Sequence, residues 1–233
     1  ARLTAYQNLL FNSLFINFEN AQWSFKNKII DTKNLSSIAS DVSDDVYNLT
    51  PKVQNELVVR EKVSTMAVAA SHSLIFRILN NASEKNLGME GYPAEYGIYL
   101  SIIKANKLHK LSKGEFKFVE PSKSNKELSA LHNEFNKHIK SKDEPTSLNE
   151  LYDLFSKQPY GIKKGLIPIL LASFYMTNEG SFALYNTDEQ GKEFLITDYN
   201  KRICERFIST PETLKMMFVK IEGEKQTLLD KFK

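Results

Sequence analysis

The sequence contains a single cysteine and no long apolar run. Cys204 has no second cysteine to pair with, so the chain forms no internal disulfide. No apolar run approaches the roughly 18–20 residues that a membrane-spanning helix requires. With 42% apolar residues among 233, the chain can still bury one substantial core or two small ones. These features predict a folded cytoplasmic protein without a membrane partner.

The sequence also shows no catalytic, metal-binding or cofactor-binding motif. The phosphate-binding pattern Gly-x-x-x-x-Gly-Lys-[Ser/Thr] is missing, so ATP binding cannot be assigned to this chain. His72 has no His or Cys three or four residues away, and the acidic cluster Asp41, Asp44 and Asp45 lacks the spaced glycine and further oxygen ligand of a calcium loop. We therefore predict no catalytic residue, no metal and no cofactor. His72 is expected at the surface or in a hydrogen bond, and Cys204 in the core.

The positive charge is mild overall but unevenly distributed. A net charge of +3 and a pI near 8.7 do not by themselves require nucleic acid as a partner. Residues 104–142, however, carry ten lysines against four glutamates. Lysine-rich loops can hold phosphates by charge alone, although they also serve simply to keep a loop soluble. Lys123 and Lys126 in this stretch are candidate nucleic-acid contacts.

The first 144 residues are predicted to be mostly helical. Apolar spacing indicates helical structure from Thr4 to about Lys28 and a second helix over 32–44. Thr50 and Pro51 are suited to cap and begin a third helix, and Ser64 is suited to cap a fourth helix that runs through Leu79.

The next stretch alternates turns, a short hairpin and two helices. Two glycines permit a turn before Pro93, which can begin a helix toward Asn106. A strand or hairpin is expected at 115–119 and a helix at 126–139. Glu95 falls in the first helical turn, where the macrodipole favours a carboxylate, so capping explains it without catalysis.

Residues 146–199 are the most informative part of the chain. Ser147 and Glu150 fit a capping box, Pro159 ends the first helix, and Gly161 can adopt a left-handed turn conformation. A second helix follows, and then two aromatic strands flank an Asn- and Asp-rich turn at 186–191. The order helix, turn, helix, wing predicts a winged-helix-like module, a fold that often contacts DNA.

Two features weaken DNA reading by this module. The second helix, over 166–175, is so apolar that it must be largely buried, whereas a helix that reads bases shows polar side chains on its outer face. The hairpin tip is acidic, which favours a protein partner. On this helix only the N-terminal lysines, Lys163 and Lys164, and Ser173 remain available for nucleic acid. Tyr160 of the turn is a further candidate contact and is expected to shape the turn. Short helices through Phe207 and from Pro211 to Met217, and a strand from Phe218, are expected to follow.

Several short motifs occur in an order that resembles a known family. They are Thr50-Pro51-x-x-x-Asn55-Glu56-Leu57, Gly88-x-x-Gly91-Tyr92-Pro93-x-Glu95 and Pro159-Tyr160-Gly161-x-x-x-Gly165-x-Ile167-Pro168. Together they resemble the helical and winged-helix region downstream of the ATPase core in large P-loop ATPases of bacterial phage-defence islands, the BREX-type ATPases and their relatives. The resemblance implies a non-catalytic segment that relays nucleotide state to DNA or to partner subunits.

The sequence thus predicts a mainly α protein. An N-terminal helical bundle with a lysine-rich insertion, residues 1–144, precedes a winged-helix-like domain with a small β-hairpin and a tail, residues 145–233. The chain begins at Ala1 with an amphipathic pattern already present, so we expect a piece of a longer polypeptide. The expected function is nucleic-acid binding or regulation within a larger assembly, with DNA or other subunits as partners. The alternatives are a protein–protein interaction scaffold and a hydrolase whose acids, Glu90 or Glu95, meet a histidine in a deep pocket.

Overall fold

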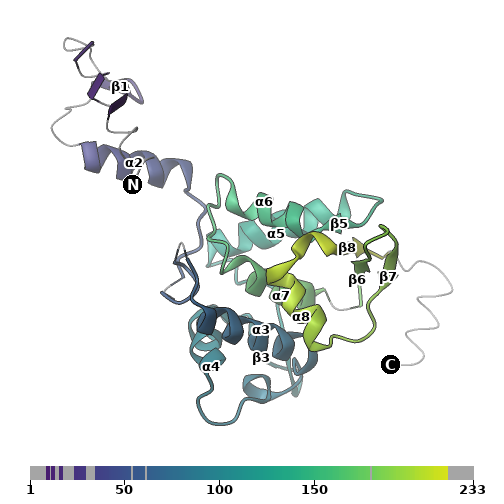
Figure 1. The fold of residues 1–233 in the computed structure, drawn as a ribbon. Coiled ribbons are helices and arrows are strands. Elements are labelled where there is room, and N and C mark those ends of the chain that lie inside the picture. Colours follow the sequence, from purple (N-terminus) through teal and green to yellow (C-terminus); the bar gives the residue numbers. More distant parts are fainter. Residues whose placement is uncertain are drawn as a thin grey trace. The chain divides into compact units, whose positions relative to one another are not determined.

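The computed structural model describes residues 9–10, 12–13, 16–17, 24–29, 35–53, 55–60, 62–178 and 180–219. The chain divides into two compact units, residues 1–46 and residues 47–233. Helices predominate in the described residues and are accompanied by small antiparallel sheets (Figure 1). The prediction of a mainly helical chain with a small β component is confirmed at this level.

The first unit contains a hairpin and a helix in its described residues. Strands β1 (Ser24–Phe25) and β2 (Lys28–Ile29) pair in antiparallel register. Helix α2 (Leu35–Val46) follows, close to its predicted place. Residues 9–10, 12–13 and 16–17 are helical as predicted, but the predicted extension of that helix to Lys28 is wrong. Lys26 and Asn27 have φ values of 51° and 60°, a left-handed turn that ends any helix and that Asn tolerates well.

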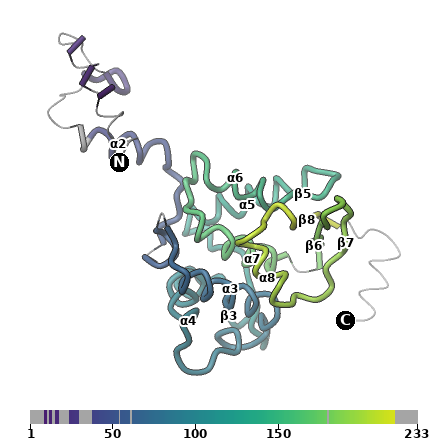
Figure 2. Tube along the Cα trace, in the orientation of Figure 1, coloured from purple at the N-terminus to yellow at the C-terminus, as the bar shows by residue number. Residues whose placement is uncertain are grey.

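The second unit contains a four-stranded antiparallel sheet in the order β5-β8-β6-β7. Its strands are β5 (Thr146–Ser147), β6 (Phe182–Thr187), β7 (Glu193–Leu195) and β8 (Leu214–Phe218). The hairpin β6–β7 was predicted. Figure 2 shows that the chain returns at its C-terminal part to place β8 beside β6, where Leu184 lies opposite Met216.

The core of this unit centres on a completely buried helix. Helix α7 (Ile167–Thr177) is buried from Ile167 to Met176, as its apolar composition predicted. It contacts α3 (Thr65–Asn80), α5 (Lys126–Lys140) and α6 (Leu148–Ser156), and α8 (Lys201–Ser209) packs on α3. Phe174 of α7 packs against Phe135 of α5 and Phe155 of α6, with ring centroids 5.6 and 6.2 Å away. Burial of such aromatic rings dominates the stability of a core.

Local capping explains where most of these helices begin. The Ser64 hydroxyl accepts a hydrogen bond from the amide of Ala67 at the start of α3, as predicted. Asn125 and Asn200 cap α5 and α8 in the same way. Ser147 caps α6, but Glu150 does not complete a capping box; its carboxylate instead contacts His138 at 2.9 Å and Lys142.

Between α3 and α5 the chain forms short elements. These are the 3₁₀ turn η2 (Lys85–Gly88), helix α4 (Ala94–Ile98), the π-helical turn η3 (Tyr99–Lys104), and the hairpin strands β3 (His109–Ser112) and β4 (Glu115–Phe118). Pro93 precedes α4, and the α4–η3 helix ends near Asn106, as predicted.

The packing of the second unit crosses the predicted boundary between residues 144 and 145. Phe135 of α5 lies before that boundary, and its ring contacts Phe155 of α6 and Phe174 of α7, which lie after it. The division observed at residues 46 and 47 therefore differs from the predicted one.

Two further expectations are corrected. Residues 51–53 and 55–60 form no regular helix; Thr50 does not cap one, because its hydroxyl donates to the carbonyls of Tyr47 and Tyr160. The predicted helix from Pro211 to Met217 is only a 3₁₀ turn, η4 (Pro211–Thr213), and the strand β8 begins at Leu214. The predicted strand residues beyond Val219 lie outside the described residues.

None of the helices in the described ranges combines the length and the apolar character that a bilayer crossing requires.

Candidate functional site

The β3–β4 hairpin has one apolar face and one basic face. Because side chains alternate along a strand, His109 and Leu111 of β3 share a face with Phe116 and Phe118 of β4. The opposite face carries Lys110 directly across from Lys117, with Ser112 across from Glu115 one pair further along. Like charges opposite each other in a sheet are destabilising, so this pair costs folding energy unless an anion lies nearby.

More lysines surround the hairpin. The side chain of Asn125 donates a hydrogen bond of 2.9 Å to the side chain of Asn106, which holds the loop before α5 against the end of the η3 segment. This contact brings the predicted residues Lys123 and Lys126 to the same part of the molecule as the hairpin. We call the exposed lysines of this region the lysine surface. They are Lys104, Lys107, Lys110, Lys113, Lys117, Lys123 and Lys126.

The lysine surface forms no close ion pair among the described residues, although Glu115 shares a hairpin face with Lys110 and Lys117. Within the described part of the chain, none of its seven ammonium groups forms an ion pair or a hydrogen bond. Other lysines do pair: Lys142 contacts Glu150, and Lys215 lies 2.7 Å from Glu193. Unpaired charges held together in this way attract anions and lose that attraction as salt is added.

The turn at 159–165 buries one of its predicted contact residues, Tyr160, and exposes the other two, Lys163 and Lys164. Tyr160 is buried, with 7% of its surface exposed, so its ring cannot contact nucleic acid; it shapes the turn, as expected. Gly161 takes the predicted left-handed conformation with φ of 59°. Lys163 and Lys164 are exposed at the end of the turn. They belong to the connection between α6 and α7, not to the lysine surface.

Burial of α7 limits what a winged-helix-like module could do here. All side chains from Ile167 to Met176 lie in the core. Reading of base edges requires a helix with an exposed polar face in the major groove. Helix α7 offers no such face.

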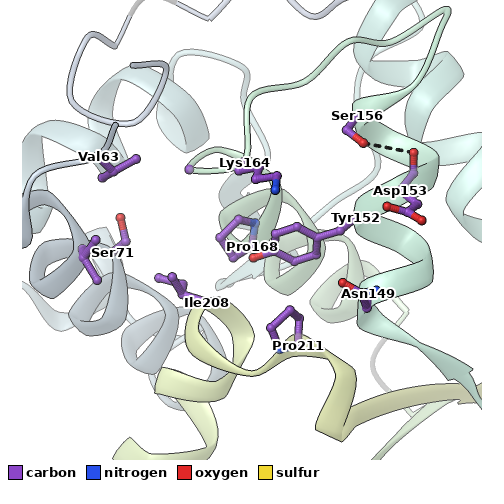
Figure 3. Close-up of a pocket in the computed structure, with 12 residues that line it drawn as sticks. Val63, Ser71, Asn149, Tyr152, Asp153, Ser156, Lys164, Pro168, Ile208 and Pro211 are labelled. Carbon is purple, nitrogen blue, oxygen red and sulfur yellow. Dashed lines mark hydrogen bonds between the residues drawn. The ribbon is translucent and has the colours of Figure 1, made fainter. Parts of the chain in front are cut away.

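A cavity of about 270 Å³ lies beside Lys164. Figure 3 shows Lys164, Pro168 and Tyr152 at its centre, with Val63 on one side and Asp153 on the other. The hydroxyl of Tyr152 donates to the carbonyl of Phe207 at 2.6 Å, and burial raises its pKa. That hydroxyl is therefore engaged in a structural hydrogen bond. The cavity has mainly apolar walls and the charged residues Asp153 and Lys164, rather than a nucleophile paired with a base.

A second cavity, of about 620 Å³, contains the residues that the hydrolase alternative requires. Glu95 and His72 both line it, together with Arg77, Lys201 and Glu205. Glu95 is 7% exposed and its carboxylate accepts a hydrogen bond of 3.0 Å from the guanidinium of Arg77.

The ion pair between Glu95 and Arg77 argues against catalysis by this carboxylate. The carboxylate oxygen that accepts from the guanidinium of Arg77 at 3.0 Å is already held in a structural ion pair and is not free to face a substrate. Contrary to expectation, His72 is neither fully exposed nor hydrogen-bonded: its Nε2 is buried without a partner among the described residues, and burial lowers its pKa. The cavity holds a neutral imidazole beside a structural ion pair.

The sequence also predicted that Cys204 is not a nucleophile and that the chain holds no metal. Cys204 is buried at 1% exposure, and burial raises the pKa of its thiol to about 12, so the thiolate that a nucleophile needs does not form. Among the described residues, no three His, Cys, Asp or Glu side chains gather as metal ligands would.

The sequence interpretation missed one feature of the hairpin and one of the turn before α4. It did not place Lys110 opposite Lys117, although the alternation around Lys113-Gly114 could have set that register. It also gave no role to Tyr92, whose side chain is 91% exposed. Comparison of the chain with protein-family models, curated proteins and solved structures finds no match.

Proposed function

We propose that this chain is a non-catalytic nucleic-acid-binding module of a larger assembly. The observation that carries the proposal is the lysine surface, in which Lys110 and Lys117 face each other on an exposed hairpin and neither forms an ion pair with a carboxylate of the described residues. A cross-strand pair of this kind costs stability in the free protein, and phosphate groups relieve that cost. Binding of this type is governed by charge and reads no sequence.

The same proposal includes a winged-helix-like module and a helical bundle within this fold. The order α6, turn, α7, β6–β7 hairpin supports a winged-helix-like module, and the helices before it support a helical bundle. With α7 enclosed, the module acts as a scaffold, and the contacts come from the lysine surface, with Lys163 and Lys164 as a second, smaller contact. The resemblance to the region downstream of the ATPase core in phage-defence proteins suits a segment that relays nucleotide state to nucleic acid.

Electrophoretic mobility shift over a salt series tests the proposal with single- and double-stranded DNA. Counterion release lowers log K by about 0.7 per phosphate contact per decade of salt for a single strand and by about 0.9 for a duplex. Lys110→Glu/Lys117→Glu should therefore reduce the salt slope by about 1.4 on single strands and weaken binding at low salt. Lys163→Glu/Lys164→Glu tests the second contact in the same way.

A matched control variant makes the same change in charge at another part of the surface. Lys192→Glu/Lys201→Glu reverses two exposed lysines on the β6–β7 hairpin and α8 and should leave binding nearly unchanged. If the unmodified chain shifts neither DNA form at low salt, or if the control loses as much affinity as Lys110→Glu/Lys117→Glu, the proposal is rejected.

A protein-interaction scaffold is the second candidate, and the edge of the sheet favours it. Strand β7 lies at that edge, and its Phe194 and Leu195 are 46% and 56% exposed. An edge strand with exposed apolar side chains can add a strand from another chain. Salt-insensitive binding to a partner, lost in Phe194→Ser but kept in Lys110→Glu/Lys117→Glu, would favour this function over the first.

A further inference from the structure

A chain of aromatic contacts runs from an exposed tyrosine to the apolar face of the β3–β4 hairpin. The ring of Tyr92 meets Tyr96 edge-on with centroids 5.7 Å apart, and Tyr96 stacks on Tyr99 at 6.1 Å. Tyr99 meets His109 at 6.0 Å, and His109 meets Phe116 at 5.5 Å. The five rings form a continuous series across α4, η3 and the hairpin.

The series is open to solvent at Tyr92 and half-buried at Phe116, while its middle is fixed. Tyr92 is 91% exposed, and Phe116 is half-buried beside Leu111, which is 60% exposed. In the middle, the hydroxyl of Tyr99 donates to Nδ1 of His109 at 3.0 Å, and Nε2 of His109 donates to the carbonyl of Ala82 at 2.8 Å. The exposed rings therefore stand on a rigid base and lose little freedom when a ligand binds.

Lysines border this aromatic series. Lys107 precedes β3 and Lys113 lies at the hairpin tip, so they flank the face that carries Leu111 and Phe116. Lys110 and Lys117 occupy the other face of the same two strands. Exposed rings with lysines nearby in the fold are the combination that binds single strands, because the bases stack on the rings while the phosphates meet the charges. A duplex keeps its bases stacked inside and offers only its phosphates.

We infer that the lysine surface selects single-stranded over double-stranded nucleic acid, with Tyr92 and Phe116 as stacking platforms for unpaired bases. The inference rests on the proposed function and deepens it, since it names the form of nucleic acid that the same surface takes. Tyr92 is the better residue to test, because its exposed ring contributes little to the core and its removal leaves the fold intact. Phe116 packs on His109, so its replacement would also disturb the hairpin.

Fluorescence anisotropy with a labelled single strand of about 20 nucleotides, longer than the usual site sizes, and with the matching duplex tests the inference on the 233-residue chain. The unmodified chain should bind the single strand more tightly. Tyr92→Ala should weaken single-strand binding by about fivefold or more, the loss expected for one stacked base, and leave duplex binding unchanged. Tyr92→Phe keeps the ring and should bind as the unmodified chain does.

A control variant separates stacking from general loss of apolar surface. Met66→Ala removes another side chain that is 80% exposed, on α3, and should leave both affinities unchanged. Binding to both DNA forms with no effect of Tyr92→Ala, or with equal losses on both, overturns this inference but leaves the proposed function standing. Failure of the unmodified chain to bind either form at low salt overturns the proposed function and this inference together.

Discussion

Gly165 and Gly97 offer a prediction in which the same substitution has opposite effects. At Gly165, an added Cβ would lie 2.5 Å from the carbonyl oxygen of Val58 and 2.8 Å from a methyl group of Val63. At Gly97, in helix α4, an added Cβ would meet nothing within 4 Å. Gly165→Ala should therefore destabilise the protein, and Gly97→Ala should stabilise it.

The expected magnitudes follow from these two surroundings. The first atom met at Gly165 is backbone and cannot rotate away, so the cost should reach the upper part of the overpacking range, about 3 kcal/mol. Replacing an exposed helical glycine with alanine should gain about 0.5–1 kcal/mol. With an m-value of about 2 kcal/mol/M, the midpoint of urea unfolding should fall by about 1.5 M for Gly165→Ala and rise by about 0.3–0.5 M for Gly97→Ala.

Urea unfolding followed by circular dichroism measures both variants. An unchanged m-value would show that the midpoints report stability rather than a change in the unfolded ensemble. Equal midpoints for the two variants would refute the claim that the backbone around Val58 packs directly on the 159–165 turn. Because Gly165 follows Lys164, Gly165→Ala should also weaken any contribution of Lys164 to DNA binding.

Two further predictions concern buried titratable groups. Burial lowers the pKa of His109 and of His132, so the unfolded chain takes up protons first as the pH falls below about 6.5. The contribution of these histidines to stability should be complete above that pH. As the pH falls toward their folded-state pKa values, stability should decline by up to about 1.4 kcal/mol per pH unit for each histidine. Urea midpoints measured across pH should show this decline, and a slope of stability against pH that is unchanged in His109→Gln would refute it. Cys204, whose buried thiol has a pKa raised to about 12, should react with a thiol reagent in urea but not in native buffer; rapid native labelling would contradict its burial.

Elements set by local signals were predictable from the sequence. Ser64 marked the start of α3, the apolar run marked α7 as buried, and the turn between β6 and β7 marked their hairpin. Each of these depends on residues close together in the chain, where capping, periodicity and turn chemistry operate.

Features that depend on distant residues were not predictable. Residues 214–217 resemble a helix locally, but pairing with β5 and β6 makes them a strand. The cavity that holds His72 and Glu95 needs α3, α4 and α8 to meet. Of the predicted site residues, Lys123 and Lys126 lie near the hairpin because Asn125 bonds to Asn106, a contact that no sequence pattern predicts.

The position of β8 in the sheet has a consequence for synthesis of the protein. β8 is the last described strand along the chain, yet it lies between β5 and β6 and bonds to both. A ribosome that has not yet delivered residues 214–218 leaves those two earlier strands without their shared neighbour. The sheet therefore closes late, and a nascent chain released before that point would carry two open edges ready to pair with the wrong partner.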